Sequence, residues 1–312
     1  MSPARECWVD SNKESESRRD GINLRGLKRI LWIVGHEEPV NNDLWSFMLP
    51  IRLFFTLLAL ASICCAESFD KPLVKKTIDL GLSQSNPKSH AKVTCYFYSG
   101  FMVKEVDLGE KGADRLSIVP TAKGTPLTCT RARSKSEKVI DHKEWSGYFK
   151  GAKNNLVFFD ADDGVNGGVA FAIYDAKIAT RIFEDSASGP LEFSTSPDQQ
   201  LSLHYLRVLD AECAVPKEKA SCWERIKQKI GPDDFPMPDC EKGYEENAQN
   251  LAKGRCDSQN PREPDCLNKE LKVVREQWSD ASSIISYPVV VKLGTNPVIK
   301  PVAGAVKCWP AD

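Results

Sequence analysis

The residues of this chain that could do chemistry begin with an acidic loop, Asp160-Ala-Asp162-Asp163-Gly164-Val-Asn166-Gly-Gly168. Three carboxylates and an amide supply the hard oxygen ligands that calcium prefers. The loop departs from the EF-hand pattern, because its first glycine comes one place early and no glutamate closes it. The Asn-Gly pair is also a strong hairpin signal, since both residues tolerate positive φ. The loop therefore predicts a β-turn first, and a calcium site formed by Asp160, Asp162, Asp163 and Asn166 as the alternative.

A histidine between carboxylates is the candidate for catalysis. His142 lies between Asp141 and Glu144 in the sequence DHKEW, where a carboxylate could support it as a general base. The same polar stretch is typical of a solvent-exposed connection. His204 alternates with apolar residues, which predicts ordinary packing on a strand. No G-x-S-x-G, H-E-x-x-H or glycine-rich phosphate motif occurs, so a hydrolase using His142 is the alternative function and not the preferred one.

Aromatic residues offer a third kind of site. Trp145 and Tyr148 closely precede the acidic loop, and Tyr174 is expected to share one strand face with Ala170 and Ala172. Aromatic side chains over a shallow face can bind a glycan or a peptide, although core packing explains the same residues. The three aromatic residues are therefore candidate ligand contacts. A glycan or a protein of the cell envelope is the expected class of partner.

Cysteines carry the most constrained chemistry. Eight follow residue 66, no two of them have a C-x-x-C spacing, and no histidine lies near the C-terminal ones, so zinc binding is disfavoured against four disulfides. We predict one bridge between Cys95 and Cys129, a second between Cys213 and Cys308, and two more within the remaining set. That set consists of Cys222, Cys240, Cys256 and Cys266.

A signal-like segment sets the compartment. Residues 48–66, MLPIRLFFTLLALASICCA, combine a nearby cation, an apolar run and small residues at the end, as secretory signal peptides do. Residues 1–47 form a charged leader whose one apolar patch, Leu31 to Val34, cannot build a core, and translation from Met48 would remove it. The predicted location is periplasmic or extracellular, with no membrane span left after cleavage. The alternative is an uncleaved anchor from Leu53 to Ala66, which is short against the roughly 20 residues that a spanning helix needs.

Charge excludes one class of partner. Lys plus Arg number 42 and Asp plus Glu number 43, with both signs interspersed along the chain. Nucleic-acid binding calls for a clustered basic face, which this pattern does not provide. The chain also has no Asn-x-Ser/Thr glycosylation acceptor, which favours a bacterial envelope protein over a eukaryotic secreted one.

The elements that must position these residues are mostly strands. Short alternating runs punctuated by glycine turns extend through residues 67–215 and predict an antiparallel, β-sandwich-like domain. One of these runs is Leu127 to Arg133. Residues 216–279 have helical spacing, with Leu267, Leu271, Val274 and Trp278 as one apolar stripe, and predict a cysteine-rich helical insert. Residues 280–312 return to strand. The fold class is therefore mainly β, or α+β overall when the insert is included.

These observations predict an exported envelope or secreted protein that binds a ligand or serves a structural role without catalysis. They do not identify the ligand. No cofactor is expected apart from the calcium considered above.

Overall fold

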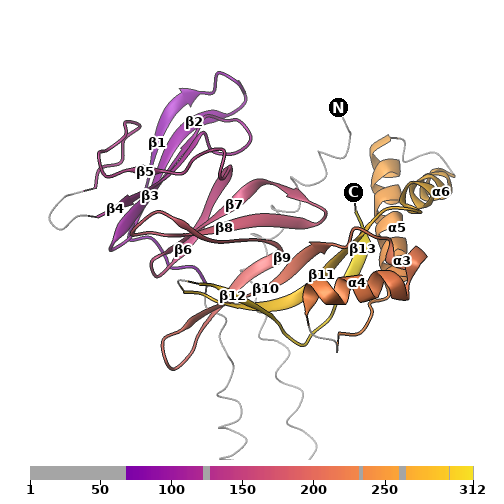
Figure 1. The fold of residues 1–312 in the computed structure, drawn as a ribbon. Coiled ribbons are helices and arrows are strands. Elements are labelled where there is room, and N and C mark those ends of the chain that lie inside the picture. Colours follow the sequence, from indigo (N-terminus) through magenta and orange to yellow (C-terminus); the bar gives the residue numbers. More distant parts are fainter. Residues whose placement is uncertain (1–67, 122–126, 232–234, 260–264, 295, 312) are drawn as a thin grey trace, which may run out of the picture. The chain divides into compact units, whose positions relative to one another are not determined.

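The computed structural model describes residues 68–121, 127–231, 235–259, 265–294 and 296–311. The predicted leader and signal segment lie outside these residues. The described residues form two antiparallel β-sheets and a group of helices (Figure 1). This architecture confirms the predicted fold class, a β-sandwich-like body with a disulfide-bonded helical insert. Within the described ranges, no helix is long and apolar enough to cross a membrane.

The first sheet is a five-stranded meander in the order β1-β2-β3-β4-β5. Its second strand, β2, alternates as the sequence predicts, with Val93 and Cys95 buried on the outer face of the sheet. The edge strand β1 was not predicted, because most of its residues are exposed and its apolar alternation is weak. The strands are β1 (Val74–Leu82), β2 (His90–Phe97), β3 (Phe101–Asp107), β4 (Arg115–Pro120) and β5 (Lys138–Val139).

The second sheet has eight strands. Seven follow the order β12-β11-β10-β9-β8-β7-β6, and β13 pairs with β11 beside β12, so that β12 and β13 lie end to end along one side of β11. The strands are β6 (Gly147–Lys153), β7 (Leu156–Val165), β8 (Gly168–Asp175), β9 (Arg181–Thr195), β10 (Leu201–Asp210), β11 (Ser283–Lys292), β12 (Val298–Pro301) and β13 (Lys307–Pro310).

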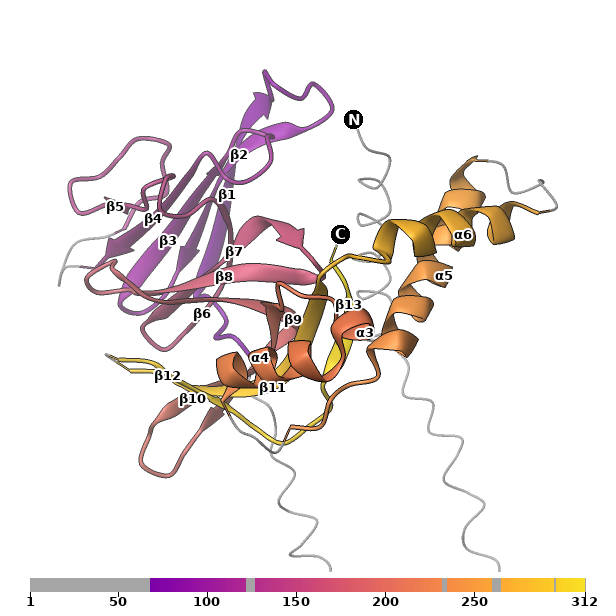
Figure 2. The ribbon, with the colours of Figure 1, turned by 45° about the vertical axis from the view of Figure 1, so that its right-hand side comes forward.

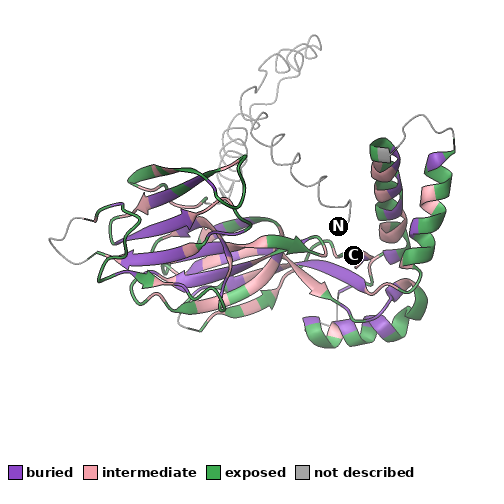
Figure 3. Cartoon of the chain, turned by 90° about the horizontal axis from the view of Figure 1, so that it is seen from above, coloured by how far each residue is buried: buried purple, intermediate pink, exposed green. Residues whose placement is uncertain are grey.

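The two sheets pack through a shared apolar core. The five-stranded sheet contributes Phe101, Val103 and Ile118, and the backbone amide of Phe149 on β6 donates a hydrogen bond to the buried Glu105 carboxylate on β3 (2.8 Å). The eight-stranded sheet contributes alternate residues of β7 and β8, which are Val157, Phe159, Ala172 and Tyr174. The opposite face of the same two strands belongs to a second core, through Phe158, Phe171 and Ile173. Figure 3 shows buried residues running along the strands, with exposed residues at the turns and edges.

The helices leave the sheet after β10 and return to it as β11, the neighbouring strand (Figure 2). Helix α4 closes the second core with apolar residues spaced along one face, Cys222, Trp223, Ile226 and Ile230. Helices α5 and α6 pack against each other, and α5 also contacts β13. The helices are α3 (Val215–Glu218), α4 (Ala220–Ile230), α5 (Cys240–Gln259) and α6 (Cys266–Trp278).

Four disulfides pair all eight cysteines of the described residues, which indicates folding in an oxidising environment. The predicted Cys95–Cys129 bridge is present. The predicted Cys213–Cys308 bridge is wrong. Cys213 bonds Cys222 instead, because the chain turns back through the short helix α3 into α4 soon after β10. Cys308 on β13 bonds Cys240 at the start of α5. The last bridge, Cys256–Cys266, joins α5 to α6.

The predicted strand from Leu127 to Arg133 is also wrong. This segment is irregular and covers the outer face of the five-stranded sheet, where Leu127 and Cys129 pack on the core. Side chains satisfy its backbone in place of a neighbouring strand. Lys104 donates to the Ala132 carbonyl (2.9 Å) and Arg115 donates to the Arg131 carbonyl (2.6 Å).

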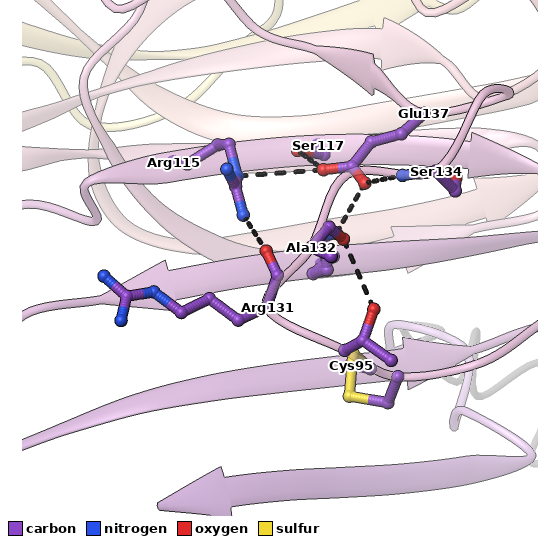
Figure 4. Close-up of polar contacts among 10 residues, drawn as sticks. Cys95, Arg115, Ser117, Arg131, Ala132, Ser134 and Glu137 are labelled. Carbon is purple, nitrogen blue, oxygen red and sulfur yellow. Dashed lines mark hydrogen bonds and ion pairs between the residues drawn. A yellow bond between two sulfur atoms is a disulfide. The ribbon is translucent and has the colours of Figure 1, made fainter. Parts of the chain in front are cut away.

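A buried acidic residue, Glu137, helps to hold this segment over the sheet. The Glu137 carboxylate is fully buried and forms an ion pair with Lys104 (2.5 Å). It also accepts hydrogen bonds from the Ser117 hydroxyl (2.9 Å) and the Ser134 amide (3.0 Å), and Figure 4 shows these partners around it. Although burial opposes it, the bonds from Lys104, Ser134 and Ser117 leave the pKa of Glu137 below its ordinary value.

Candidate binding site

The acidic loop forms the hairpin between β7 and β8. Val165 pairs with Gly168, and the two residues between them, Asn166 and Gly167, both have positive φ (53° and 73°). These angles are those of a type I′ turn, whose twist matches the flanking strands. The hairpin prediction is therefore confirmed.

The carboxylates of this hairpin are held by lysines. Asp160 forms an ion pair with Lys150 (2.6 Å), and Asp163 forms one with Lys111. Burial raises the pKa of Asp160, while the Lys150 ammonium opposes the rise. Across the described part of the chain, no group of three or more His, Cys, Asp or Glu residues is arranged to hold a metal ion. The placement of Asp160, Asp162, Asp163 and Asn166 therefore lends no support to the calcium prediction.

His142 lies exposed in a turn before β6. The Asp141 carboxylate accepts a hydrogen bond from the Lys143 amide (2.9 Å), and the Asp141 carbonyl accepts bonds from the amides of Glu144 and Trp145 (2.9 Å each). The His142 ring has no hydrogen bond or ion pair with any described residue. The neighbouring carboxylate that was expected to support it as a base is used to stabilise the turn.

The candidate aromatic residues lie in the core between the sheets or at its edge. Trp145 is 8% exposed and Tyr174 is 1% exposed, and both lie in the core between the sheets. Burial raises the pKa of Tyr174 to about 12. Tyr148 lies at the edge of that core, where its hydroxyl accepts a hydrogen bond from the Gly112 amide (2.8 Å). The shallow alanine face of β8 is covered by the other sheet.

A groove lies on the helical pair α5–α6. It has a volume of about 350 Å³ and is lined by residues of both helices. These residues are Glu245, Gln249, Asn250, Lys253, Leu267, Asn268, Leu271 and Arg275. Helices α5 and α6 contact each other and lie next to each other in Figures 1 and 2.

Covalent and packing constraints fix the width of this groove. Cys256–Cys266 joins the two helices, and Cys240–Cys308 attaches the first turn of α5 to β13. Ala248 and Ala252 are buried on α5, where small side chains let two helices approach closely, and Val274 is buried on α6. The groove is therefore preformed, which lowers the entropic cost of binding.

The polar lining of the groove is asymmetric. Arg275 donates two hydrogen bonds to the Glu245 carboxylate (2.6 and 2.9 Å), which lowers the pKa of Glu245. Gln249 donates to the same carboxylate (2.8 Å). Lys253, in contrast, forms no ion pair with any residue that the structure describes. Leu267, which is 49% exposed, and the half-buried Leu271 provide the apolar part of the groove.

The sequence predicted this apolar stripe but not its role. Leu267, Leu271, Val274 and Trp278 were predicted to form one apolar stripe of a helix, and of these only Val274 is buried. No local pattern of the sequence indicated that Leu267 would stay about half exposed beside α5. Comparison with protein-family models, with curated proteins and with solved structures found no match.

Proposed function

We propose that this chain is an exported protein, periplasmic or otherwise outside the cytoplasm, which binds another protein through the α5–α6 groove. Export is supported by the signal-like segment 48–66 together with the four disulfides. The observation that carries binding is the pair Leu267 and Leu271 lining a preformed groove between two disulfide-bonded helices.

The lining favours a protein partner over a glycan. Glycan sites use exposed aromatic faces, and none of the eight residues that line this groove is aromatic. Two leucines four residues apart lie on one face of α6 and offer apolar surface on which the apolar face of an amphipathic helix can pack. The Lys253 ammonium is available to a carboxylate on that helix. The proposed occupant is therefore an amphipathic helix that carries apolar residues and at least one acidic residue.

The test is an array of glycans and of helical peptides, probed with the secreted, disulfide-bonded protein. Peptides with apolar residues at i and i+4 and a neighbouring carboxylate should bind, and glycans should not. Affinities of the peptides that bind are then measured by calorimetry. Replacing Leu267→Glu should weaken binding at least tenfold, because a charge then replaces apolar surface in the groove.

The matched control is Val273→Glu. Val273 is similarly exposed on α6 (44%) but does not line the groove. The control should bind the peptides as the wild type does. Glycan binding, or peptide binding that Leu267→Glu leaves unchanged, contradicts the proposed site.

A further inference from the structure

A second group of reactive side chains lies on the eight-stranded sheet. Along β9 to β12, odd-numbered residues such as Phe193, Leu203 and Val291 are buried in the second core. The even-numbered residues point to the opposite face, and several of them are only half-buried or exposed. This face is open to solvent where β9 meets β10.

Strand register places two polar rows on this face. One row contains Ser194, Ser202 and Lys292, each directly opposite the next. The adjacent row contains Glu192 opposite His204. Side chains directly opposite each other in a sheet have Cβ atoms about 4.5–5.5 Å apart, so the two rows bring Ser194 and His204 of neighbouring strands within reach of each other.

One contact between the two rows has the geometry of an activated nucleophile. The Ser194 hydroxyl oxygen lies 2.7 Å from His204 Nε2. This is the separation at which an imidazole takes the proton from a serine hydroxyl, and both residues are half-buried, so a small molecule can reach them. The sequence predicted only packing for His204, because its serine partner lies ten residues away on the next strand.

We propose that Ser194 and His204 are catalytic residues that cleave carboxylic esters. In this step the Ser194 oxygen bonds to the ester carbonyl carbon while His204 takes the hydroxyl proton. The carbon–oxygen bond to the alcohol breaks, and the alcohol leaves with that proton. Water then attacks the acyl-serine, gives a proton to His204, and releases the carboxylic acid as the proton returns to Ser194. This activity is independent of the α5–α6 groove.

The test is labelling of the folded, disulfide-bonded protein with a fluorophosphonate. The Ser194 oxygen displaces fluoride from phosphorus, and mass spectrometry of the peptides locates the adduct. Labelling should occur at Ser194 and be absent in Ser194→Ala. In His204→Asn, which keeps a polar side chain but cannot take the proton, the labelling rate should fall at least about 100-fold, as expected for loss of a general base.

The matched control is Ser202→Ala. Ser202 occupies the same row of the same face, and no hydrogen bond joins its hydroxyl to the His204 ring among the described residues, so this variant should be labelled at the wild-type rate. Circular dichroism and the melting temperature establish that each variant is folded. A folded wild type that takes up no label overturns the proposal, and so does a folded His204→Asn variant that is labelled at Ser194 as fast as the wild type.

Discussion

The Lys104–Glu137 pair holds an irregular segment over a sheet, and it does so at a desolvation cost. Both side chains are almost fully buried. Two charges without water are stable only when every remaining polar atom is bonded, which Ser117, Ser134 and the Ala132 carbonyl achieve here. The pair therefore fixes the position of the segment Leu127 to Arg133 over the sheet. The net contribution of the ion pair to the free energy of unfolding is small compared with the loss caused by removing one partner.

Removing one partner of this pair should destabilise the protein strongly. Glu137→Leu leaves the Lys104 ammonium buried without its carboxylate, and we expect the free energy of unfolding to fall by about 3–5 kcal/mol. Replacing both residues, as Lys104→Met with Glu137→Leu, should restore most of that loss, because the fully buried ammonium is then gone as well. Arg115, whose Nε lies 3.7 Å from the Glu137 carboxylate, keeps its bond to the Arg131 carbonyl and is partly exposed. Urea denaturation of the single and double variants measures the coupling.

The pH dependence of the stability provides a control for this prediction. Because the folded pKa of Glu137 lies below its ordinary value of 4.5, the pair stabilises the protein above that pH and loses this contribution as the pH falls through the lowered pKa. The double variant should lack this part of the acid dependence. Equal stability of Glu137→Leu and the wild type at neutral pH would contradict the account.

At the scale of the elements, two glycines of helix α5 allow its packing against β13 to be tested. A Cβ atom at Gly243 would lie 1.8 Å from the Cys308 carbonyl oxygen, whereas a Cβ atom at Gly254 would contact nothing within 4 Å. Gly243→Ala should therefore lower the free energy of unfolding by about 1–3 kcal/mol, because the helix must move away from β13. Chemical denaturation gives this value directly.

Gly254→Ala is the matched substitution in the same helix. It should raise the free energy of unfolding by about 0.5–1 kcal/mol, because alanine restricts the unfolded chain and favours the helix. If both variants change stability in the same direction, the close approach of α5 to β13 is not present in solution.

The elements also show what the sequence could predict. Strands such as β8 were evident from alternation and from their turn residues, because both signals are local. The cover from Leu127 to Arg133 was mistaken for a strand, since its composition does not reveal that Lys104 and Arg115 bind its carbonyls. The groove and the Ser194–His204 contact also depend on which elements become neighbours, and no local pattern contains that information.

On the scale of the whole molecule, the disulfides differ in how much chain they constrain. Cys240–Cys308 closes a separation of 68 residues and Cys256–Cys266 one of 10. On the chain-entropy model, replacing the first pair by alanines should cost about 4 kcal/mol and replacing the second about 3 kcal/mol. Denaturation of both double variants under non-reducing conditions measures the difference.

Peptide binding in the α5–α6 groove should also distinguish the two double alanine variants. Loss of Cys256–Cys266 should weaken peptide binding in the groove while the sheets keep their near-ultraviolet circular dichroism, because this bridge joins only α5 and α6. A variant that lacks this bridge but binds peptides with unchanged affinity would contradict the role given to it.

Strand β8 has a consequence for how the sequence can diverge. Phe171 and Ile173 face one core while Ala172 and Tyr174 face the other. Most surface strands accept polar substitutions at every second position, but this segment has no such tolerant position between residues 171 and 174. Among descendants of this gene, selection should therefore preserve those four codons as apolar long after the neighbouring loops have lost any recognisable likeness.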